Sequence, residues 1–247
     1  MTVSDTEARL AAELWLDRLD DADALRVMLE NQAGASAAVA ASLAQIEAAA
    51  GAMTARLAAD ERARIIYAGA GTSIRIAVQD GVELGPTFDW PADRLAYLVA
   101  GGDGALITAV ENAEDDGAAA MQAVAALGLS PSDILIALSA SGRTGFTCAA
   151  ARAARQDGAL TIGIANNDGS ELLEAAEIAI PLVTGPEAVA GSTRLKAGTA
   201  QKICLNMIST LVMTRLGYVR DGQMVAMKPG NAKLRERYDR IHGADDS

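Results

Sequence analysis

The sequence predicts an α/β protein, a three-layer αβα sandwich with a five-stranded, mainly parallel sheet and additional N-terminal helices. The first observation is a series of five short runs of apolar, largely β-branched residues, at 64–69, 95–99, 134–138, 160–165 and 178–183. The second is that helix-compatible segments separate most of these runs. Strands that alternate with helices are typical of βαβ units, whose parallel sheet is covered on both faces.

Residues 1–60 carry apolar residues at helical spacing and show no strand pattern. We expect a break at 20–23 and then one long helix over 25–57, in which Gly34 and Gly51 are weak points. A long alanine-rich helix with one apolar face is usually a packing surface or an oligomer interface. The segment is therefore predicted to be a helical arm that packs on the core or on a dimer partner, without catalytic residues.

Residues 61–240 are predicted to form the α/β domain. The helices expected between and after its strands span residues 74–82, 104–110, 117–127, 146–155, 171–176 and 198–216. Asp115 or Asp116 is placed to cap the third of these helices. Leu84–Phe88 contains Gly-Pro and is predicted to be a tight apolar turn. The last helix is apolar on nearly every side, so we expect it to be deeply buried, with Gly217 ending it.

Composition excludes several classes of protein. The net charge of −11 has the wrong sign for a nucleic-acid binder, and aromatic residues make up only 3% of the chain. No apolar run is long enough to span a bilayer, and the N-terminus lacks the pattern of a secretion signal. Cys148 and Cys204 are isolated, which favours a reducing, cytoplasmic compartment, and His242 lies too near the end to anchor a core site. We expect no nucleic-acid partner, no membrane partner and no metal.

Three loops follow predicted strands or begin predicted helices and are rich in small or hydroxyl residues: 69–73, 139–144 and 191–202. In an open parallel sheet, ligands bind beyond the carboxyl ends of the strands. The run Ser139-Ala-Ser-Gly-Arg-Thr144 follows a buried strand and precedes a helix, so backbone N–H and side-chain hydroxyl groups meet at one point. Such a loop suits phosphate. The alternative is a Ser/Gly turn that only caps the following helix.

The loop 69–73 has the Gly-x-Gly beginning of a dinucleotide-binding fingerprint. Ile74 stands where the third glycine would be required, and the second strand ends without an acidic residue for the ribose. These two features disfavour NAD, and a phosphosugar contact or a structural turn remain open.

Three glutamates are candidates for proton transfer: Glu83, Glu111 and Glu114. For any one of them, a solvated surface charge is the ordinary alternative. Because the chain has no well-placed histidine or reactive cysteine, an enzyme built on this sequence would have to move protons with carboxylates.

Together these motifs resemble the SIS (sugar isomerase) domain family and, within it, the N-acetylmuramic acid 6-phosphate etherases. The Ser-x-Ser-Gly-x-Thr loop matches SIS domains in general. The stretches 82–88, 109–116 and 191–202, with the sequences Val-Glu-Leu-Gly-Pro-Thr-Phe, Ala-Val-Glu-Asn-Ala-Glu-Asp-Asp and Gly-Ser-Thr-Arg-Leu-Lys-Ala-Gly-Thr-Ala-Gln-Lys, match the etherase group. The resemblance covers about residues 63–237.

The resemblance implies cleavage of a lactyl ether to N-acetylglucosamine 6-phosphate and D-lactate, by elimination and hydration, without a cofactor. Glu83 matches the proton donor to the leaving lactate, and Glu114 matches a second acid/base residue. The family is dimeric with sites near the interface, so a homodimer is implied. The implied contacts to the phosphorylated amino sugar are Thr72, Ser73, Ser139, Ser141, Gly142, Thr144, Glu187, Ser192 and Lys196.

Two stretches of the sequence depart from the family pattern. Ile74 replaces a glycine, and we expect its β-branched side chain to narrow the pocket. Leu84-Gly85 stands where the family has Cys-Pro, and we expect the family's C-terminal helical extension to be absent. A phosphosugar isomerase and a non-catalytic phosphosugar-binding regulator are the alternative functions. An isomerase would share the phosphate loop and a glutamate base but release no lactate.

Overall fold

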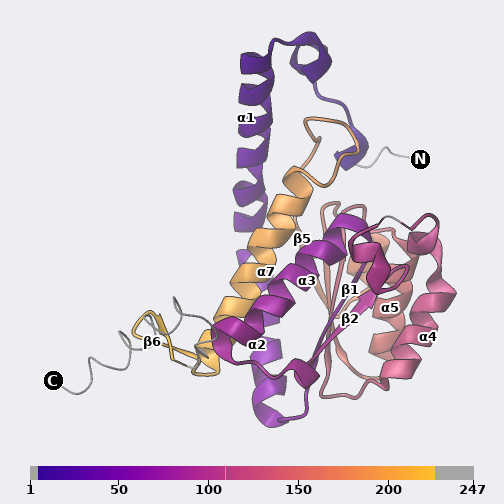
Figure 1. Ribbon diagram of the computed structural model, residues 1–247, viewed down its shortest axis with the longest axis vertical. Helices are drawn as coiled ribbons and strands as arrows, with labels where there is room; N and C mark the ends of the chain where they lie inside the picture. Colours follow the sequence, from indigo (N-terminus) through magenta and orange to yellow (C-terminus); the bar gives the residue numbers. More distant parts are fainter. Residues whose placement is uncertain (1–4, 109, 226–247) are drawn as a thin grey trace.

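A computed structural model describes residues 5–108 and 110–225. Its centre is a five-stranded parallel sheet in the order β2-β1-β3-β4-β5 (Figure 1). The strands are β1 (Ile65–Gly69), β2 (Leu95–Val99), β3 (Ile134–Ser139), β4 (Leu160–Ala165) and β5 (Ile178–Pro181). All five lie where the sequence predicts them, and every pairing between them is parallel. The short strands β6 (Val219–Arg220) and β7 (Gln223–Met224) form a separate antiparallel pair.

Helices cover both faces of this sheet, which confirms the three-layer prediction. One face packs against α2 (Leu43–Ala59), α3 (Gly71–Phe88) and α7 (Lys196–Arg215). The other packs against α4 (Gly117–Leu127), α5 (Gly145–Gln156) and α6 (Glu171–Ala175). Every residue of β1, β3 and β4 is buried. This explains why these strands are continuous apolar runs rather than alternating patterns.

The tight turn predicted over Leu84–Phe88 is wrong, because α3 continues through these residues. Leu84 and Phe88 are both buried at i,i+4 spacing, so burial of this apolar face extends the helix through Gly85 and Pro86. The helix ends at Asp89, which takes a left-handed conformation with φ of 55°. The Gly-Pro pair therefore indicated a turn that tertiary packing overrides.

Two other helices differ from prediction. The helix expected over residues 104–110 is replaced by a 3₁₀ turn, η5 (Asp103–Leu106), and residue 109 lies outside the described residues. Helix α7 is present, but one of its faces is open, since Lys202, Met207 and Thr210 are exposed. That face lines an open groove of about 780 Å³ beside α2. The predicted deep burial therefore holds for the face of α7 that packs into the core, and not for this open face. Asp116 caps α4 as predicted, accepting a hydrogen bond of 2.9 Å from the Ala119 N–H.

The N-terminal arm consists of short 3₁₀ turns followed by α1 (Asp21–Ala40) and α2. The single long helix predicted here is wrong, because the chain turns at Ala41–Ser42, where the Ser42 hydroxyl donates to the Pro181 carbonyl at 2.6 Å. Gly34 and Gly51 lie inside the two helices. Helix α1 packs along α7 and then extends beyond the sandwich (Figure 1). The part of the arm in residues 1–4 and the part of the predicted domain in residues 226–240 lie outside the described residues.

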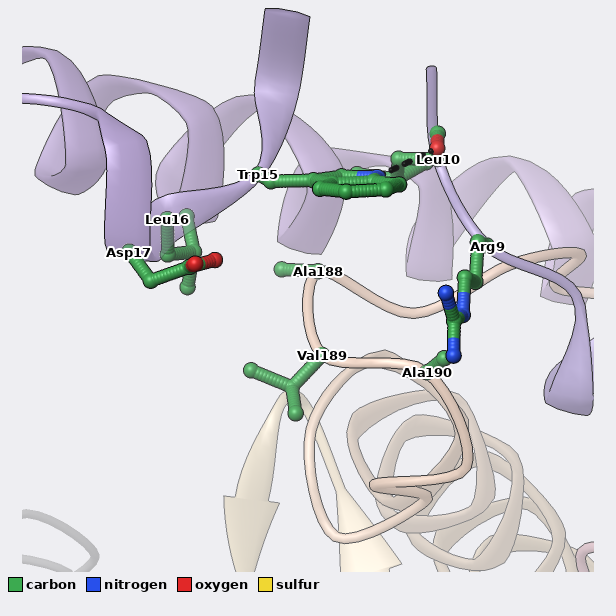
Figure 2. Close-up of a pocket in the computed structure, with 8 residues that line it drawn as sticks. All are labelled: Arg9, Leu10, Trp15, Leu16, Asp17, Ala188, Val189 and Ala190. Atoms are coloured by element: carbon green, nitrogen blue, oxygen red, sulfur yellow. Dashed lines mark hydrogen bonds between the residues drawn. The ribbon is translucent and has the colours of Figure 1, made fainter. Parts of the chain in front are cut away.

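The first turns of the arm return to the loop that joins β5 to α7. The Gly191 N–H donates to the Thr6 carbonyl at 3.0 Å. Figure 2 shows the Trp15 ring of the arm above Ala188 of this loop, and Arg9 beside Ala190. These residues and Val189 line a cavity of about 480 Å³. None of the predicted site residues lines this cavity, so the candidate site lies elsewhere.

Among the described residues, no single helix is both long and apolar enough to cross a membrane. Helices α1 and α2 reach the necessary length and apolar composition only when taken together, and they are bent by 58° relative to each other.

Candidate functional site at the carboxyl edge of the sheet

The loop after β3 forms a compact hydroxyl cluster, as the sequence predicts. Ser139 is the last residue of β3, and its Oγ lies 2.8 Å from Thr144 Oγ1 and 3.3 Å from Ser141 Oγ. The Gly142 N–H donates to Ser139 Oγ at 3.0 Å. Thr144 is the residue before the first turn of α5, so the hydroxyls gather at the positive end of that helix. The arrangement is suited to hold an anion.

Gly142 is required by the geometry of this loop. Its φ is +69°, a conformation that residues with a Cβ rarely adopt. A Cβ at this position would also lie 2.1 Å from the Ser170 Oγ. Glycine therefore allows the loop to lie directly against the residue that precedes α6.

Glu187 and Lys196, both predicted from the third loop, lie together at the start of α7. The fully buried Glu187 carboxylate accepts hydrogen bonds from the Lys196 N–H at 3.0 Å and the Ala197 N–H at 2.8 Å. The Lys196 ammonium donates to the Pro186 carbonyl at 2.7 Å. Burial lowers the pKa of Lys196, and the charge of Glu187 acts in the opposite direction. Both Glu187 oxygens thus satisfy backbone donors of the helix, while Ser192 lies half-buried in the same loop.

Replacement of Glu187 by alanine is expected to lower the free energy of unfolding by about 2–3 kcal/mol, because two buried N–H groups at a helix start lose a charged acceptor. Glu187→Gln keeps one acceptor oxygen and should lose less. Glu174→Ala, an exposed glutamate on α6, is the control and should change stability by under ~0.5 kcal/mol. Urea denaturation measures all three, and equal losses for Glu187→Ala and Glu174→Ala would contradict the capping role.

The first loop lies beside the start of α7. Thr72 and Ser73 are in the first turn of α3, after Gly71 with φ of +53°. A Cβ on Gly198 of α7 would lie 3.4 Å from Thr72 Cγ2, so the two helix starts are in close contact. Ser73 is 7% exposed. Ile74 is 1% exposed and belongs to the apolar core, so the expectation that it narrows a pocket is wrong.

Glu114 lines a polar cavity of about 240 Å³ between the first loop and the turn η6 (Ala113–Asp115). The cavity wall also includes Gly71, Arg75 and Glu111. The same turn reaches the hydroxyl loop, since a Cβ on Gly145 would lie 3.0 Å from the Asp115 carbonyl oxygen. The structure therefore brings Glu114, the first loop (residues 69–73) and the hydroxyl loop (residues 139–144) to one edge of the sheet.

Glu83 does not lie at this edge within the same chain. It is exposed on α3, eight residues beyond Arg75, which corresponds to about 12 Å along the helix axis. It does not line the cavity that contains Glu114. Of the two predicted acid/base residues, only Glu114 is placed beside the other candidate residues of its own chain.

Sequence reasoning missed two amide residues that follow β4. The buried Asn166 donates to the Leu182 carbonyl at 3.0 Å and accepts from Gln201 Nε2 at 2.9 Å. Asn167 donates to the Ala140 carbonyl at 2.9 Å and thereby supports the hydroxyl loop. The sequence could have indicated both residues, because polar residues directly after a buried parallel strand lie at the edge of the sheet where ligands bind.

Sequence reasoning also missed Asp80, a buried carboxylate on α3 that accepts three hydrogen bonds. Tyr67 Oη donates at 3.0 Å, Asn206 Nδ2 at 2.7 Å and Ser209 Oγ at 3.0 Å. The last two residues lie on α7, so Asp80 fixes α3 against α7. Its position on the apolar stripe, between Ala77 and Leu84 at i+3 and i+4 spacing, could have revealed it.

Neither cysteine offers a nucleophile. Burial raises the pKa of Cys148 to about 11 and that of Cys204 to about 12, so both thiols stay protonated at neutral pH. Within 5–108 and 110–225, no group of three or more His, Cys, Asp or Glu side chains has an arrangement suited to a metal ion. His242 lies outside these ranges.

Comparison with known proteins agrees with this architecture. The model of the SIS domain matches residues 108–211, and that of the glucokinase regulatory protein N-terminal SIS domain matches residues 48–154. Among solved structures, a phosphoheptose isomerase from Francisella tularensis has a TM-score of 0.58 at 24% identity, covering 80% of this chain and 98% of its own. A protein from E. coli has a TM-score of 0.59 at 12% identity, covering 83% and 97%. These likenesses show the fold.

Curated relatives are closer in sequence. The N-acetylmuramic acid 6-phosphate etherase of Deinococcus radiodurans is 47% identical over 226 residues, which cover 92% of this chain and 73% of the relative. Those of Rubrobacter xylanophilus and Streptomyces coelicolor are 44% and 46% identical, each over 96% of this chain and 78% or 75% of the relative. With this level of identity over most of its length, the chain belongs to the N-acetylmuramic acid 6-phosphate etherase family, on an SIS fold.

Proposed function

We propose that the protein is a carbon–oxygen lyase that cleaves the lactyl ether of N-acetylmuramic acid 6-phosphate, giving N-acetylglucosamine 6-phosphate and D-lactate. The observation that carries the proposal is the 41–47% identity to the curated etherases. The site supports it, because a hydroxyl loop suited to phosphate lies at the same edge of the sheet as the cavity of Glu114. Such a reaction belongs to the metabolism of amino sugars and the recycling of cell-wall material.

The proposed chemistry is an elimination followed by a hydration, in which the protein's carboxylates only transfer protons. In the ring-opened sugar the C1 aldehyde acidifies the C2 proton, and a carboxylate removes it. The C3–O bond breaks, its electron pair leaves with the lactate oxygen, and a carboxylic acid protonates that oxygen. Water then adds to C3 of the unsaturated aldehyde and a proton returns to C2. Glu83 is proposed as the donor to lactate and Glu114 as the second acid/base group.

Ser139, Ser141, Gly142 and Thr144 are proposed to hold the 6-phosphate through hydroxyl and N–H donors. Thr72 and Ser73 are proposed to lie near the sugar. Ser192 and Lys196 are proposed as further contacts from the third loop. Glu187 was also predicted to touch the substrate, and its two hydrogen bonds to the start of α7 favour a supporting role.

The position of Glu83 supports a homodimer with composite sites. Glu83 and its neighbour Val82 are exposed, and Val82 is 52% exposed. Ile107 and Val110, on the chain segment that precedes Glu114, are 91% and 49% exposed, as expected for apolar residues that another surface covers. We propose that Glu83 of one subunit completes the cavity that contains Glu114 of its partner. The predicted division into an arm, residues 1–60, and an SIS domain, residues 61–240, fits this proposal, with the arm contributing to the subunit contact.

A cytoplasmic location is proposed as well, on the two unpaired, buried cysteines.

Incubation of the purified protein with N-acetylmuramic acid 6-phosphate tests the proposed function. The expected products are D-lactate and N-acetylglucosamine 6-phosphate in equal amounts, measured by an enzymatic lactate assay and mass spectrometry. An isomerase would give a sugar of unchanged mass, and a binding regulator would give no product. Either result from a folded preparation would remove the etherase proposal.

A further inference from the structure

Arg75 lies in the wall of the cavity that Glu114 lines, one helical turn after Gly71 on α3. Its guanidinium holds the turn η5 in place. Nε donates to the Leu106 carbonyl at 2.9 Å, and Nη2 donates to the Ala105 carbonyl at 2.9 Å. Arginine has five N–H donors in a planar fork, so these two bonds leave three of them for other acceptors.

The positive charge of Arg75 has no carboxylate partner in the part of the chain that the structure describes. The ion pairs found there involve other arginines, and Arg75 is within 4.0 Å of no acidic oxygen. Glu111 and Glu114 share its cavity but do not pair with it. A half-buried guanidinium that lines a polar cavity and forms no direct ion pair keeps donors for an anionic ligand.

The proposed substrate carries two anions. The Ser139–Thr144 loop provides hydroxyl and N–H donors for the phosphate, so the lactyl carboxylate is left for a separate contact. Planar, bidentate recognition of a carboxylate is a particular property of arginine. The lactyl group is attached at C3, the carbon next to C2, so it lies close to the proton transfers in which Glu114 is proposed to take part. An arginine in the Glu114 cavity is therefore placed to meet it.

We propose that Arg75 binds the lactyl carboxylate and so determines specificity for a carboxylate-bearing ether at C3. This inference rests on the proposed function and adds the recognition of the leaving group to it. The contact requires no bond to form or break, because Arg75 holds the carboxylate while the lactate oxygen departs from C3.

Arg94 offers a matched control. It also donates to loop carbonyls, to Ala63 at 2.8 Å and to Asp60 at 3.3 Å, and its guanidinium lies 4.2 Å from the Trp90 ring centroid. It precedes β2, however, and so lies at the opposite edge of the sheet from the cavity. Replacing Arg94 therefore measures how much activity is lost when loop carbonyls lose their arginine donor and no substrate contact is removed.

The test compares N-acetylmuramic acid 6-phosphate with its analogue in which the lactyl carboxylate is a neutral carboxamide. Release of N-acetylglucosamine 6-phosphate is the common readout for both. Arg75→Met should lower kcat/KM for the carboxylate substrate by roughly 10- to 100-fold, the range for a hydrogen-bonded charge, and for the carboxamide by less than about 3-fold. Arg75→Lys should recover part of the loss. Arg94→Met should affect both substrates equally.

Equal losses on the two substrates for Arg75→Met would show that Arg75 only positions η5, and would overturn the inference. No loss on either substrate would overturn it as well. A wild-type protein that converts both substrates equally well would remove the carboxylate contact but keep the etherase. A wild-type protein that converts neither would remove the proposed function, and with it the lactyl group that Arg75 is proposed to bind.

Discussion

Glu83→Ala and Glu114→Ala are each expected to lower etherase turnover by at least ~10²-fold, the low end for loss of acid–base catalysis. Both side chains are exposed, so neither variant should lose stability, and circular dichroism and urea denaturation check that the fold is intact. Glu111→Ala is the matched control, because Glu111 lines the same cavity wall and has no proposed role in proton transfer. Wild-type turnover in either of the first two variants would mean that another group moves the proton.

The proposed composite site leads to a sharper prediction for mixtures of these two variants. In a dimer of one Glu83→Ala subunit and one Glu114→Ala subunit, one cavity has both glutamates intact and the other has neither. Unfolding and refolding an equal mixture should restore about a quarter of the wild-type turnover, since random pairing gives about half mixed dimers with one active site each. If both glutamates acted within one chain, the refolded mixture would stay as inactive as its components.

Gly142→Ala is expected to lower the free energy of unfolding by about 2–5 kcal/mol. The left-handed φ of +69° costs a residue with a Cβ about 1–2 kcal/mol, and the overlap with Ser170 adds about 1–3 kcal/mol. Phosphosugar affinity should fall as well, because the Gly142 N–H donates to Ser139 Oγ within the hydroxyl loop. Denaturation in urea measures the first effect, and isothermal titration with N-acetylglucosamine 6-phosphate measures the second.

Gly128→Ala is the control for this loop. Gly128 has a similar φ of +55° after α4, but a Cβ there would meet no atom within 4 Å. The Gly128→Ala variant should lose only the ~1–2 kcal/mol of unfolding free energy that the left-handed backbone conformation costs a residue with a Cβ, and it should keep full affinity for N-acetylglucosamine 6-phosphate. Ser170→Gly in the Gly142→Ala background removes the clashing atoms and should recover the packing part of the loss. Equal losses at Gly142 and Gly128 would show that contact with Ser170 contributes nothing.

The sheet could be predicted from sequence because β1, β3 and β4 are buried on both faces and therefore form uninterrupted apolar runs. The position of the hydroxyl loop could be predicted for a similar reason, since it directly follows a buried strand and precedes a helix at the carboxyl edge of the sheet. Helix ends were harder to predict. The Gly85-Pro86 pair favours a turn locally, yet burial of Leu84 and Phe88 continues α3 through it.

The relation between Glu83 and Glu114 could not be predicted from the pattern, because it depends on where the turn that bears Glu114 packs along α3. That turn lies beside Gly71 and Arg75 at the start of α3, so Glu83, about two helical turns further along, lies away from the cavity of its own chain. Asp80 and Arg75 were missed because a single charge on a helix normally indicates a solvated surface. Only the packing of α3 on α7 and η5 places these two charges at buried or partly buried positions.

The most direct test of the proposed elimination and hydration is to run the reaction in water enriched in the heavy oxygen isotope and to measure the masses of both products by mass spectrometry. Elimination at C3 followed by hydration predicts one heavy oxygen on N-acetylglucosamine 6-phosphate beyond the label that its aldehyde exchanges with water. The D-lactate carries no label. Heavy oxygen on the lactate carbon that bore the ether, with none added at C3 of the sugar, would show cleavage of the other carbon–oxygen bond and contradict the proposed lyase.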